Sequence, residues 1–190
     1  MKNLSAKKSI LVPYAAFLRG INVGGHAIIK MEDLKKAFES LGLKNVRTLL
    51  ASGNVLFEAP KTSVNVLTKK IEEKLAQKFK RPIGTLIRTI EELERLKKSG
   101  PFKGVKVTPQ TRLYVTFLSE KPSSKLKIPY SSPDGNFRIL RASETELSSV
   151  ATLTPNNRTV ELMAIVEKEY GKKVTTRNWN TIAKVLKTSI

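Results

Sequence analysis

The sequence predicts an α+β protein made of two ferredoxin-like subdomains of the βαββαβ type, the second less regular than the first. Apolar residues recur at alternating and at helical spacing in segments that follow one another in that order. A Ser-Gly-Pro stretch at 99–101 separates this series from a second one of similar strand and helix order. We therefore expect a basic, disordered leader at 1–9, a first subdomain at 10–100 and a second α+β subdomain at 101–190.

The first subdomain begins with a stretch at 14–18 that is almost wholly apolar, as is typical of a central strand. A helical face follows at 31–41 and ends at Gly42, with Glu32 and Asp33 in the first turn, where the helix dipole favours acidic side chains. The remaining elements are expected in this order: a strand at 46–50, a tight turn at 52–54, a strand at 55–57, a helix at 67–79 and a strand at 85–88.

The second subdomain comes after a third helix, which a Thr-Ile-Glu-Glu capping box opens at 89–92. Its clearest strand is the alternating stretch at 113–118, whereas 121–135 is rich in Pro, Ser and Lys and predicts a loop. The other expected elements are a strand pair at 137–140 and 146–153, a helix from 154 to 170, and a last helix that starts near 175–177 and turns Trp179, Ile182, Leu186 and Ile190 inward.

This topology brings polar residues of the first subdomain together. In a βαββαβ fold the first two strands run parallel, and the third lies antiparallel between them. The loop after the first strand and the turn between the second and third strands therefore meet at one end of the sheet. The residues expected to converge there are Arg19, Asn22, Gly24, Gly25, Ser52 and Asn54.

An arginine, two amides, a hydroxyl and glycine backbone amides suit an anion, most naturally a phosphate or a carboxylate. The alternative is that Arg19 and Asn54 only hold the loops together by hydrogen bonds. A second candidate is the start of the last helix, where a threonine cap would place Arg177 and Asn178 in a first turn able to bind an anion. Ordinary capping, with Trp179 in the core, is the alternative there.

Two further observations concern single residues. His26 follows the glycines and is the candidate proton carrier, although a lone loop histidine is commonly incidental. Tyr14, Phe17 and Phe57 lie on strands where RNA-recognition domains carry stacking aromatics. The glycine- and aromatic-rich pattern of those domains is missing, so we expect these three to be core residues.

The composition excludes several classes of chemistry. The chain has no cysteine, which rules out disulfides, zinc–thiolate sites, iron–sulfur clusters and a thiol nucleophile. A single histidine argues against a histidine-based metal site. The acidic residues show no pairing typical of glycosidases or two-metal enzymes. We therefore predict no metal and no cofactor.

The formal net charge of +19 and the isoelectric point near 10.2 favour a polyanionic partner, either nucleic acid or a phosphorylated small molecule. The charge is spread along the chain, with 69–81 as the best candidate for a patch, and this spread favours a uniformly basic surface over a polyanion-binding face. The apolar run at 10–18 is too short to span a bilayer and lacks a cleavage pattern. We therefore expect a cytoplasmic protein that does not enter the membrane.

Three motifs resemble the signatures of a known bacterial family. They are RGINVGG at 19–25, SGNV at 52–55 and TTRNWNT at 175–181. With these motifs in the right order, the sequence resembles domain-of-unknown-function family 1697 over most of residues 14–188 and matches it poorly at 121–157. The resemblance implies a two-part α+β architecture with ferredoxin-like subdomains, but no activity. The residues selected on chemical grounds coincide with the signature positions, which favours one shared site.

Three functional hypotheses follow. The first is a binding site for a phosphate-bearing ligand, a nucleotide or a nucleic-acid backbone, with Arg177 and Asn178 contributed by the second part. The second is an enzyme that acts on a small anionic substrate at the same place, with His26 as proton carrier. The third is a structural or interaction module whose motifs only fasten the two parts together. The first predicts binding that weakens steeply with salt, and the second predicts stabilisation by a specific metabolite. The third predicts that substitution of the arginines lowers stability without removing a ligand.

Overall fold

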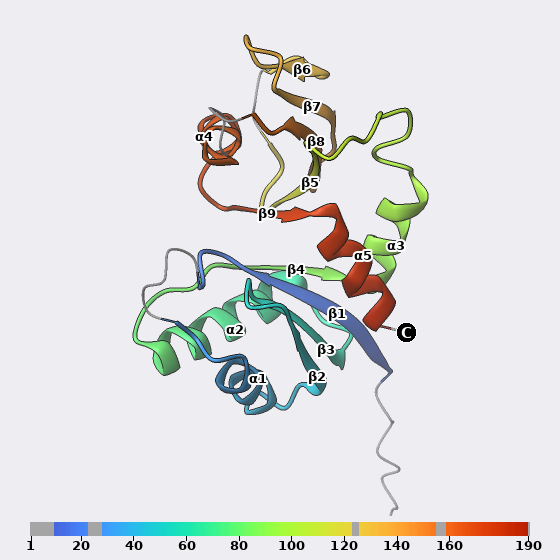
Figure 1. Cartoon of the computed structure of the whole chain (residues 1–190). Coiled ribbons are helices and arrows are strands. Elements are labelled where there is room, and N and C mark those ends of the chain that lie inside the picture. Colours follow the sequence, from blue (N-terminus) through green and yellow to red (C-terminus); the bar gives the residue numbers. More distant parts are fainter. Residues whose placement is uncertain (1–9, 23–27, 123–125, 155–158, 190) are drawn as a thin grey trace, which may run out of the picture.

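The computed structural model describes residues 10–22, 28–122, 126–154 and 159–189, which form an α+β structure with two antiparallel sheets (Figure 1). The elements up to residue 100 are β1 (Leu11–Leu18), α1 (Met31–Glu39), β2 (Lys44–Leu49), β3 (Asn54–Pro60), α2 (Val64–Phe79), β4 (Thr85–Thr89) and α3 (Ile90–Lys98). Those after it are β5 (Thr111–Leu118), β6 (Tyr130–Ser131), β7 (Phe137–Ala142), β8 (Glu146–Thr152), α4 (Thr159–Tyr170), β9 (Val174–Asn178) and α5 (Trp179–Thr188).

The first sheet has the topology that the sequence predicts. Its strand order is β2-β3-β1-β4 and each neighbouring pair is antiparallel, so β1 and β2 run parallel with β3 between them. Phe17 of β1 pairs with Asn54 of β3, which brings the end of β1 beside the β2–β3 turn. The helices α1 and α2 cover the face of this sheet that points away from the second sheet (Figure 1).

β1 is a central strand because both of its faces are buried. Tyr14, Ala16 and Leu18 belong to the core beneath α1 and α2, whereas Ala15 and Phe17 belong to a core on the opposite face. The prediction that Tyr14, Phe17 and Phe57 are core residues is confirmed, since each is at most 2% exposed.

The second sheet, with the order β6-β7-β8-β5-β9, repeats the first only in part. Among the described residues between β5 and β7 there is the short strand β6 but no counterpart of α1, as expected from the loop predicted at 121–135 and from a second subdomain less regular than the first. The Pro-, Ser- and Lys-rich sequence at 121–135 lacks the apolar spacing that a helix needs to bury one face. The described part of the following helix begins at Thr159 rather than at 154.

The predicted start of the last helix is wrong. Residues Val174–Asn178 form strand β9, which pairs with β5, and α5 begins only at Trp179. Three β-branched residues in succession favour a strand, and pairing with β5 satisfies their backbone. Thr175 therefore pairs within the sheet, while Asn178 caps α5 by accepting a hydrogen bond from the Asn180 N–H at 2.9 Å.

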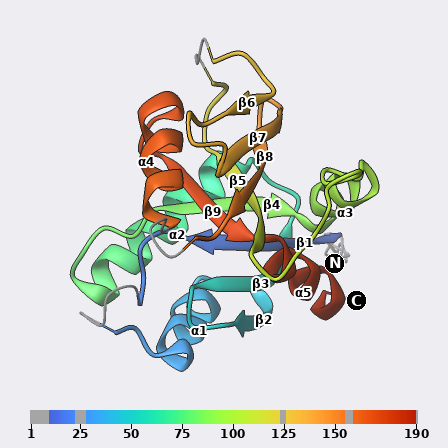
Figure 2. The ribbon, with the colours of Figure 1, turned by 45° about the horizontal axis from the view of Figure 1, so that its top comes forward.

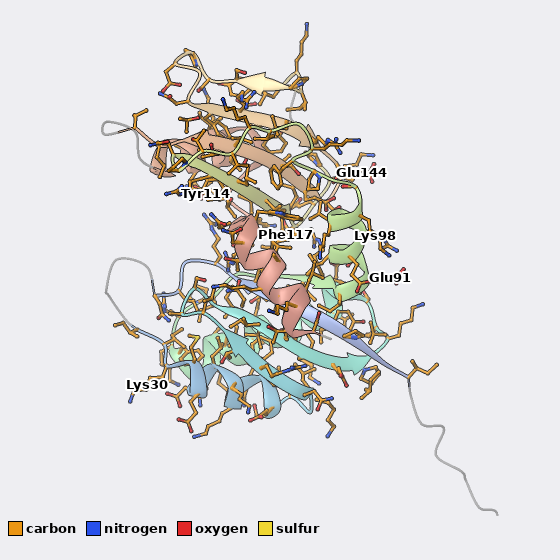
Figure 3. All side chains as sticks on the ribbon, turned by 45° about the vertical axis from the view of Figure 1, so that its right-hand side comes forward. Lys30, Glu91, Lys98, Tyr114, Phe117 and Glu144 are labelled. Carbon is orange, nitrogen blue, oxygen red and sulfur yellow. The ribbon has the colours of Figure 1, made fainter. Side chains whose placement is uncertain are left out.

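The two sheets share a core. Side chains of α3 and α5 pack there together with the facing sides of β1 and β5. The rings of Phe17 and Phe117 stack at its centre, with their centroids 4.6 Å apart, and Figure 3 shows Phe117 between the sheets. The division of the chain at residues 100 and 101 stays a prediction. In the described residues no helix has the length and apolar character needed to cross a membrane.

The strand registers show that the two sheets carry equivalent positions. Ala15 pairs with Arg88 between β1 and β4, and Val115 pairs with Arg177 between β5 and β9. The neighbouring pairs correspond in the same way: Tyr14–Thr89 with Tyr114–Asn178, and Phe17–Leu86 with Phe117–Thr175. Arg88 and Arg177 are thus equivalent, and each precedes the residue that caps the next helix.

Candidate functional site

The segment after β1 and the β2–β3 turn lie side by side, and we call residues 19–22 and 50–53 together the rim. The N–H of Leu18 donates to the carbonyl oxygen of Gly53 at 2.8 Å, and the N–H of Arg19 donates to that of Gly84 at 2.7 Å. Arg19, Asn22 and Ser52 belong to the rim, and Asn54 follows it directly. Gly24, Gly25 and His26 lie outside the described residues.

Gly53 lets the two parts of the rim approach closely. Its φ of +76° is a left-handed conformation, which glycine adopts without a steric penalty. A Cβ atom at this position would lie 2.5 Å from Cδ1 of Ile21 and 3.0 Å from Cβ of Leu18. The glycine of the SGNV motif is therefore required by the packing of the rim.

Asn22 ties the rim together through its side chain. Its Nδ2 donates to the carbonyl oxygens of Ile29 at 3.0 Å and Ala51 at 2.8 Å, and its Oδ1 accepts from the N–H of Ile29 at 2.7 Å. The φ of Asn22 is +56°, a conformation that asparagine tolerates better than most residues. The amide thus fixes the two ends of the 22–29 segment and joins them to the β2–β3 turn.

Arg177 reaches from β9 of the second sheet to the rim of the first, and Figure 2 shows β9 beside β1. Its Nε donates to Oδ1 of Asn54 at 2.7 Å. One terminal nitrogen donates to the carbonyl oxygens of Leu18 at 2.6 Å and Ser52 at 3.1 Å. The other donates to Oγ1 of Thr175 and the carbonyl oxygen of Thr176, both at 2.9 Å. All three nitrogens are therefore engaged within the protein.

The charge of Arg177 has only neutral partners in these contacts. Its hydrogen bonds end on carbonyl, amide and hydroxyl oxygens, and its guanidinium lies 5.7 Å from the centroid of the Phe17 ring. The residue is 9% exposed, and burial lowers the pKa of its guanidinium to about 10. It remains charged at neutral pH, so a buried cation lies directly behind the rim.

Asn54 and Ser52 support this arginine. The Nδ2 of Asn54 donates to the carbonyl oxygen of Leu49 at 2.8 Å and to Oγ of Ser52 at 3.2 Å, which turns Oδ1 toward Arg177. Asn54 is 1% exposed, so its amide is positioned and not free to bind a ligand. Asn178 makes none of the contacts described at the rim, because its side chain caps α5.

Arg19 is the more accessible of the two signature arginines. Its guanidinium donates to the carbonyl oxygen of Lys172 and to Oε1 of Glu167, the latter at 2.6 Å, and the two paired side chains are 37% and 30% exposed. A hollow of about 430 Å³ lies next to these contacts, lined by residues 118–122 and 168–173. Its charged lining residues are Glu120, Lys121, Lys168, Glu169, Lys172 and Lys173.

Arg88 is the residue that sequence reasoning missed. Its terminal nitrogens donate to the carbonyl oxygens of Ile87 at 2.8 Å, Leu118 at 2.7 Å and Thr145 at 2.8 Å. Arg88 thus joins the first sheet to the end of β5, as Arg177 joins the second sheet to the end of β1. The sequence does contain a signal for their equivalence. Each arginine is followed by the N-cap residue of a helix and then by a bulky apolar residue.

No group of three or more His, Asp or Glu side chains within the described residues is arranged to hold a metal ion. The contacts that dominate the site are instead hydrogen bonds from arginines to oxygen atoms. Such an arrangement fixes loops relative to one another and places positive charge beside them.

Comparison with known proteins agrees with the signature motifs. The model of the family described as "Protein of unknown function (DUF1697)" matches residues 11–136, more than half of the chain. The chain belongs to this family. The match includes the first two motifs of this DUF1697 member, whereas the third, with Arg177, lies beyond the matched residues.

Solved structures add information on the fold alone. The DUF1697 member is similar to a conserved bacterial protein from Streptococcus pneumoniae, with a TM-score of 0.69 and 18% identity over 95% of this chain and 100% of that one. An unknown protein from Galdieria sulphuraria matches with a TM-score of 0.27 and 14% identity over 89% of this chain and 98% of that one. The comparison with curated proteins gives no match.

Proposed function

We propose that this DUF1697 member binds a phosphate-bearing ligand, a nucleotide or a nucleic-acid backbone, at the rim. The observation that carries the proposal is the uncompensated charge of Arg177, whose described hydrogen bonds all end on neutral oxygens. A buried cation without a carboxylate partner leaves a positive potential at the nearby surface. A phosphate group placed there would neutralise it.

The two arginines have different roles in this proposal. Arg177 acts through its charge, because its three nitrogens already donate within the protein. Arg19 makes the direct contact. Its pair with Glu167 is partly exposed, and exposed pairs contribute only about 0–1 kcal/mol, so a phosphate can displace the carboxylate. The lysines around the adjacent hollow supply further positive charge.

A second candidate is favoured by the same contacts. Arg177 joins positions more than 120 residues away in the sequence through buried hydrogen bonds, which is what a purely structural fastener would do. In that case the motifs hold the sheets together and the surface charge is diffuse. The enzymatic alternative depends on His26, which lies outside the described residues.

The experiment is salt-dependent binding of labelled single-stranded RNA, duplex DNA and a labelled nucleoside triphosphate. It compares the wild type with Arg19→Gln and with Lys98→Gln, a control of equal charge change on the exposed side of α3 (Figure 3). We expect binding that persists near physiological salt, and a loss of several-fold in Arg19→Gln. For a nucleic acid, the salt slope should also fall by about one.

The control variant should bind like the wild type. If Arg19→Gln and Lys98→Gln both match the wild type and binding vanishes above low salt, the phosphate proposal is wrong. The structural role of the motifs then remains. Thermal unfolding of Arg19→Gln shows whether any loss comes from misfolding, since removal of a partly exposed pair should leave the fold intact.

A further inference from the structure

Each of the two buried arginines binds the end of a strand in the other sheet, and the two sets of contacts correspond. Arg177 donates to the carbonyl oxygens of Leu18 and Gly53. These two residues are themselves paired at the end of β1, where the N–H of Leu18 donates to the carbonyl oxygen of Gly53. Arg88 donates to the carbonyl oxygens of Leu118 and Thr145, which are related in the same way, since the N–H of Leu118 donates to Thr145 at 2.8 Å. Reciprocal contacts of this kind are expected across a two-fold axis.

The two arginines differ at Nε. The Nε of Arg177 donates to Asn54, whereas the Nε of Arg88 is buried and has no hydrogen-bond partner among the described residues. The residue equivalent to Asn54 is Glu146, because Phe17 pairs with Asn54 and Phe117 pairs with Glu146. The carboxylate of Glu146 accepts from Oγ1 of Thr145 instead, at 2.5 Å. A buried donor is therefore left without its acceptor, which destabilises the protein in the absence of a ligand.

A pocket of about 280 Å³ lies beside this arginine, between α3 and the β7–β8 turn. Figure 3 shows the two elements next to each other, with Glu91 and Lys98 on α3 and Glu144 on the turn. Two arginines, two glutamates and one apolar side chain dominate its lining: Arg88, Arg95, Glu92, Glu146 and Leu96. The formal charges of these arginines and glutamates cancel in the pocket, whereas the chain as a whole has a net charge of +19.

The charged side chains around the pocket are not equally free to bind a ligand, because some already have partners within the protein. The carboxylate of Glu92 already accepts from the N–H of Thr89 at 2.7 Å within the capping box. The carboxylate of Glu146 accepts from Oγ1 of the neighbouring Thr145, and Arg95 pairs with Glu91 on the exposed surface. Burial lowers the pKa of Arg88, and the charges of Glu92 and Glu146 oppose that shift, which places both carboxylates close enough to act on its charge.

We propose that this pocket binds a small zwitterion that carries a carboxylate and an ammonium group, such as a free amino acid. The carboxylate occupies the position that Asn54 Oδ1 takes at Arg177, and it accepts from Arg88 Nε and from Arg95. The ammonium group lies against Glu146, and Leu96 packs on an apolar side chain. Because Nε of Arg88 is buried, a neighbouring side chain has to move before the ligand can reach it. We assign this movement to Glu146, which stands at the position equivalent to Asn54.

The test is binding of a panel of free L-amino acids to the full chain, by calorimetry and by the shift in Tm. Acetate and methylammonium serve as probes that carry only one of the two groups. The informative variant is Glu146→Asn, which would give Arg88 the partner that Asn54 gives Arg177. We expect it to remain folded and to bind the best amino acid at least tenfold more weakly. The exposed Glu94→Gln on the same helix should bind like the wild type.

A second variant covers the case in which Glu146→Asn does not fold. Arg95 is exposed, so Arg95→Gln should keep the fold and also lose at least several-fold in affinity. The proposal is overturned if no amino acid binds at millimolar concentration, if acetate binds as tightly as the best amino acid, or if the folded variants bind like the wild type. Arg19→Gln should leave this binding unchanged, which separates it from the phosphate site.

Discussion

At the scale of single residues, Arg88 and Arg177 explain how the two sheets are held together. The planar guanidinium holds five N–H donors in a fixed fork on three nitrogens, whereas lysine has three donors on a single nitrogen. Arg177 uses this capacity at the rim, where carbonyl oxygens of β1 and of the β2–β3 turn converge. The signature residues Asn22 and Asn54 likewise use their amides to fix backbone positions.

Gly53 gives a prediction at this scale. Gly53→Ala should lower the free energy of unfolding by about 1–3 kcal/mol, because it adds left-handed strain and forces Cβ against Ile21. Gly104→Ala is the matched control, since Gly104 has a similar φ of +82° and open space around it. Denaturant unfolding of both variants separates the two causes. Equal losses at the two positions would contradict the close approach at the rim.

Asp134 gives a prediction about pH. The hydrogen bond from Ser132 and those from Asn136 lower the pKa of the Asp134 carboxyl below its usual value. A carboxyl whose pKa is lowered by folding stabilises the fold above its unfolded pKa and loses that contribution as the pH falls through the folded one. An NMR titration should find the pKa below 3.8 and should find it raised in Ser132→Ala. An unchanged pKa in the variant would show that the hydroxyl is not its cause.

At the scale of elements, α5 depends on Asn178 for its first turn. Asn178→Ala should cost about 1 kcal/mol of stability, because the Asn180 N–H loses its acceptor. The variant should bind phosphate-bearing ligands like the wild type, since Asn178 is absent from the rim contacts described. Chemical denaturation and the binding assay measure the two effects. A loss of binding without a loss of stability would restore Asn178 to the ligand site.

The elements also show what the sequence could predict. The apolar stretch of β1 and the hairpin around Gly53 each have a local signal, and together they fix the order of the first sheet. The 174–178 stretch has two competing local signals, because its β-branched residues favour a strand, whereas a Thr-Thr-Arg-Asn run before an amphipathic helix is also typical of a helix cap. Only pairing with β5 decides that it is a strand. The role of Arg177 was hidden for the same reason, since its partners in the first sheet lie more than 120 residues away.

At the scale of the whole molecule, we expect the two sheets to unfold together, because they share one core. Phe117→Leu should destabilise the protein by about 1–2 kcal/mol, because it removes the ring that stacks on Phe17. The first sheet, followed by amide exchange in β1, and the second, followed in β8, should still unfold in one transition. Two separate transitions in the wild type would contradict a core that joins the sheets.

The contact between the SGNV and TTRNWNT motifs is tested most directly by the coupling between Asn54 and Arg177, whose side chains share a buried hydrogen bond of 2.7 Å. A double-mutant cycle of Asn54→Ala and Arg177→Met, measured by denaturant unfolding, isolates that interaction. We expect a coupling free energy of about 1.5–3 kcal/mol, as is typical of a buried hydrogen bond to a charged group. A coupling below about 0.5 kcal/mol would contradict the meeting of the two motifs at the rim.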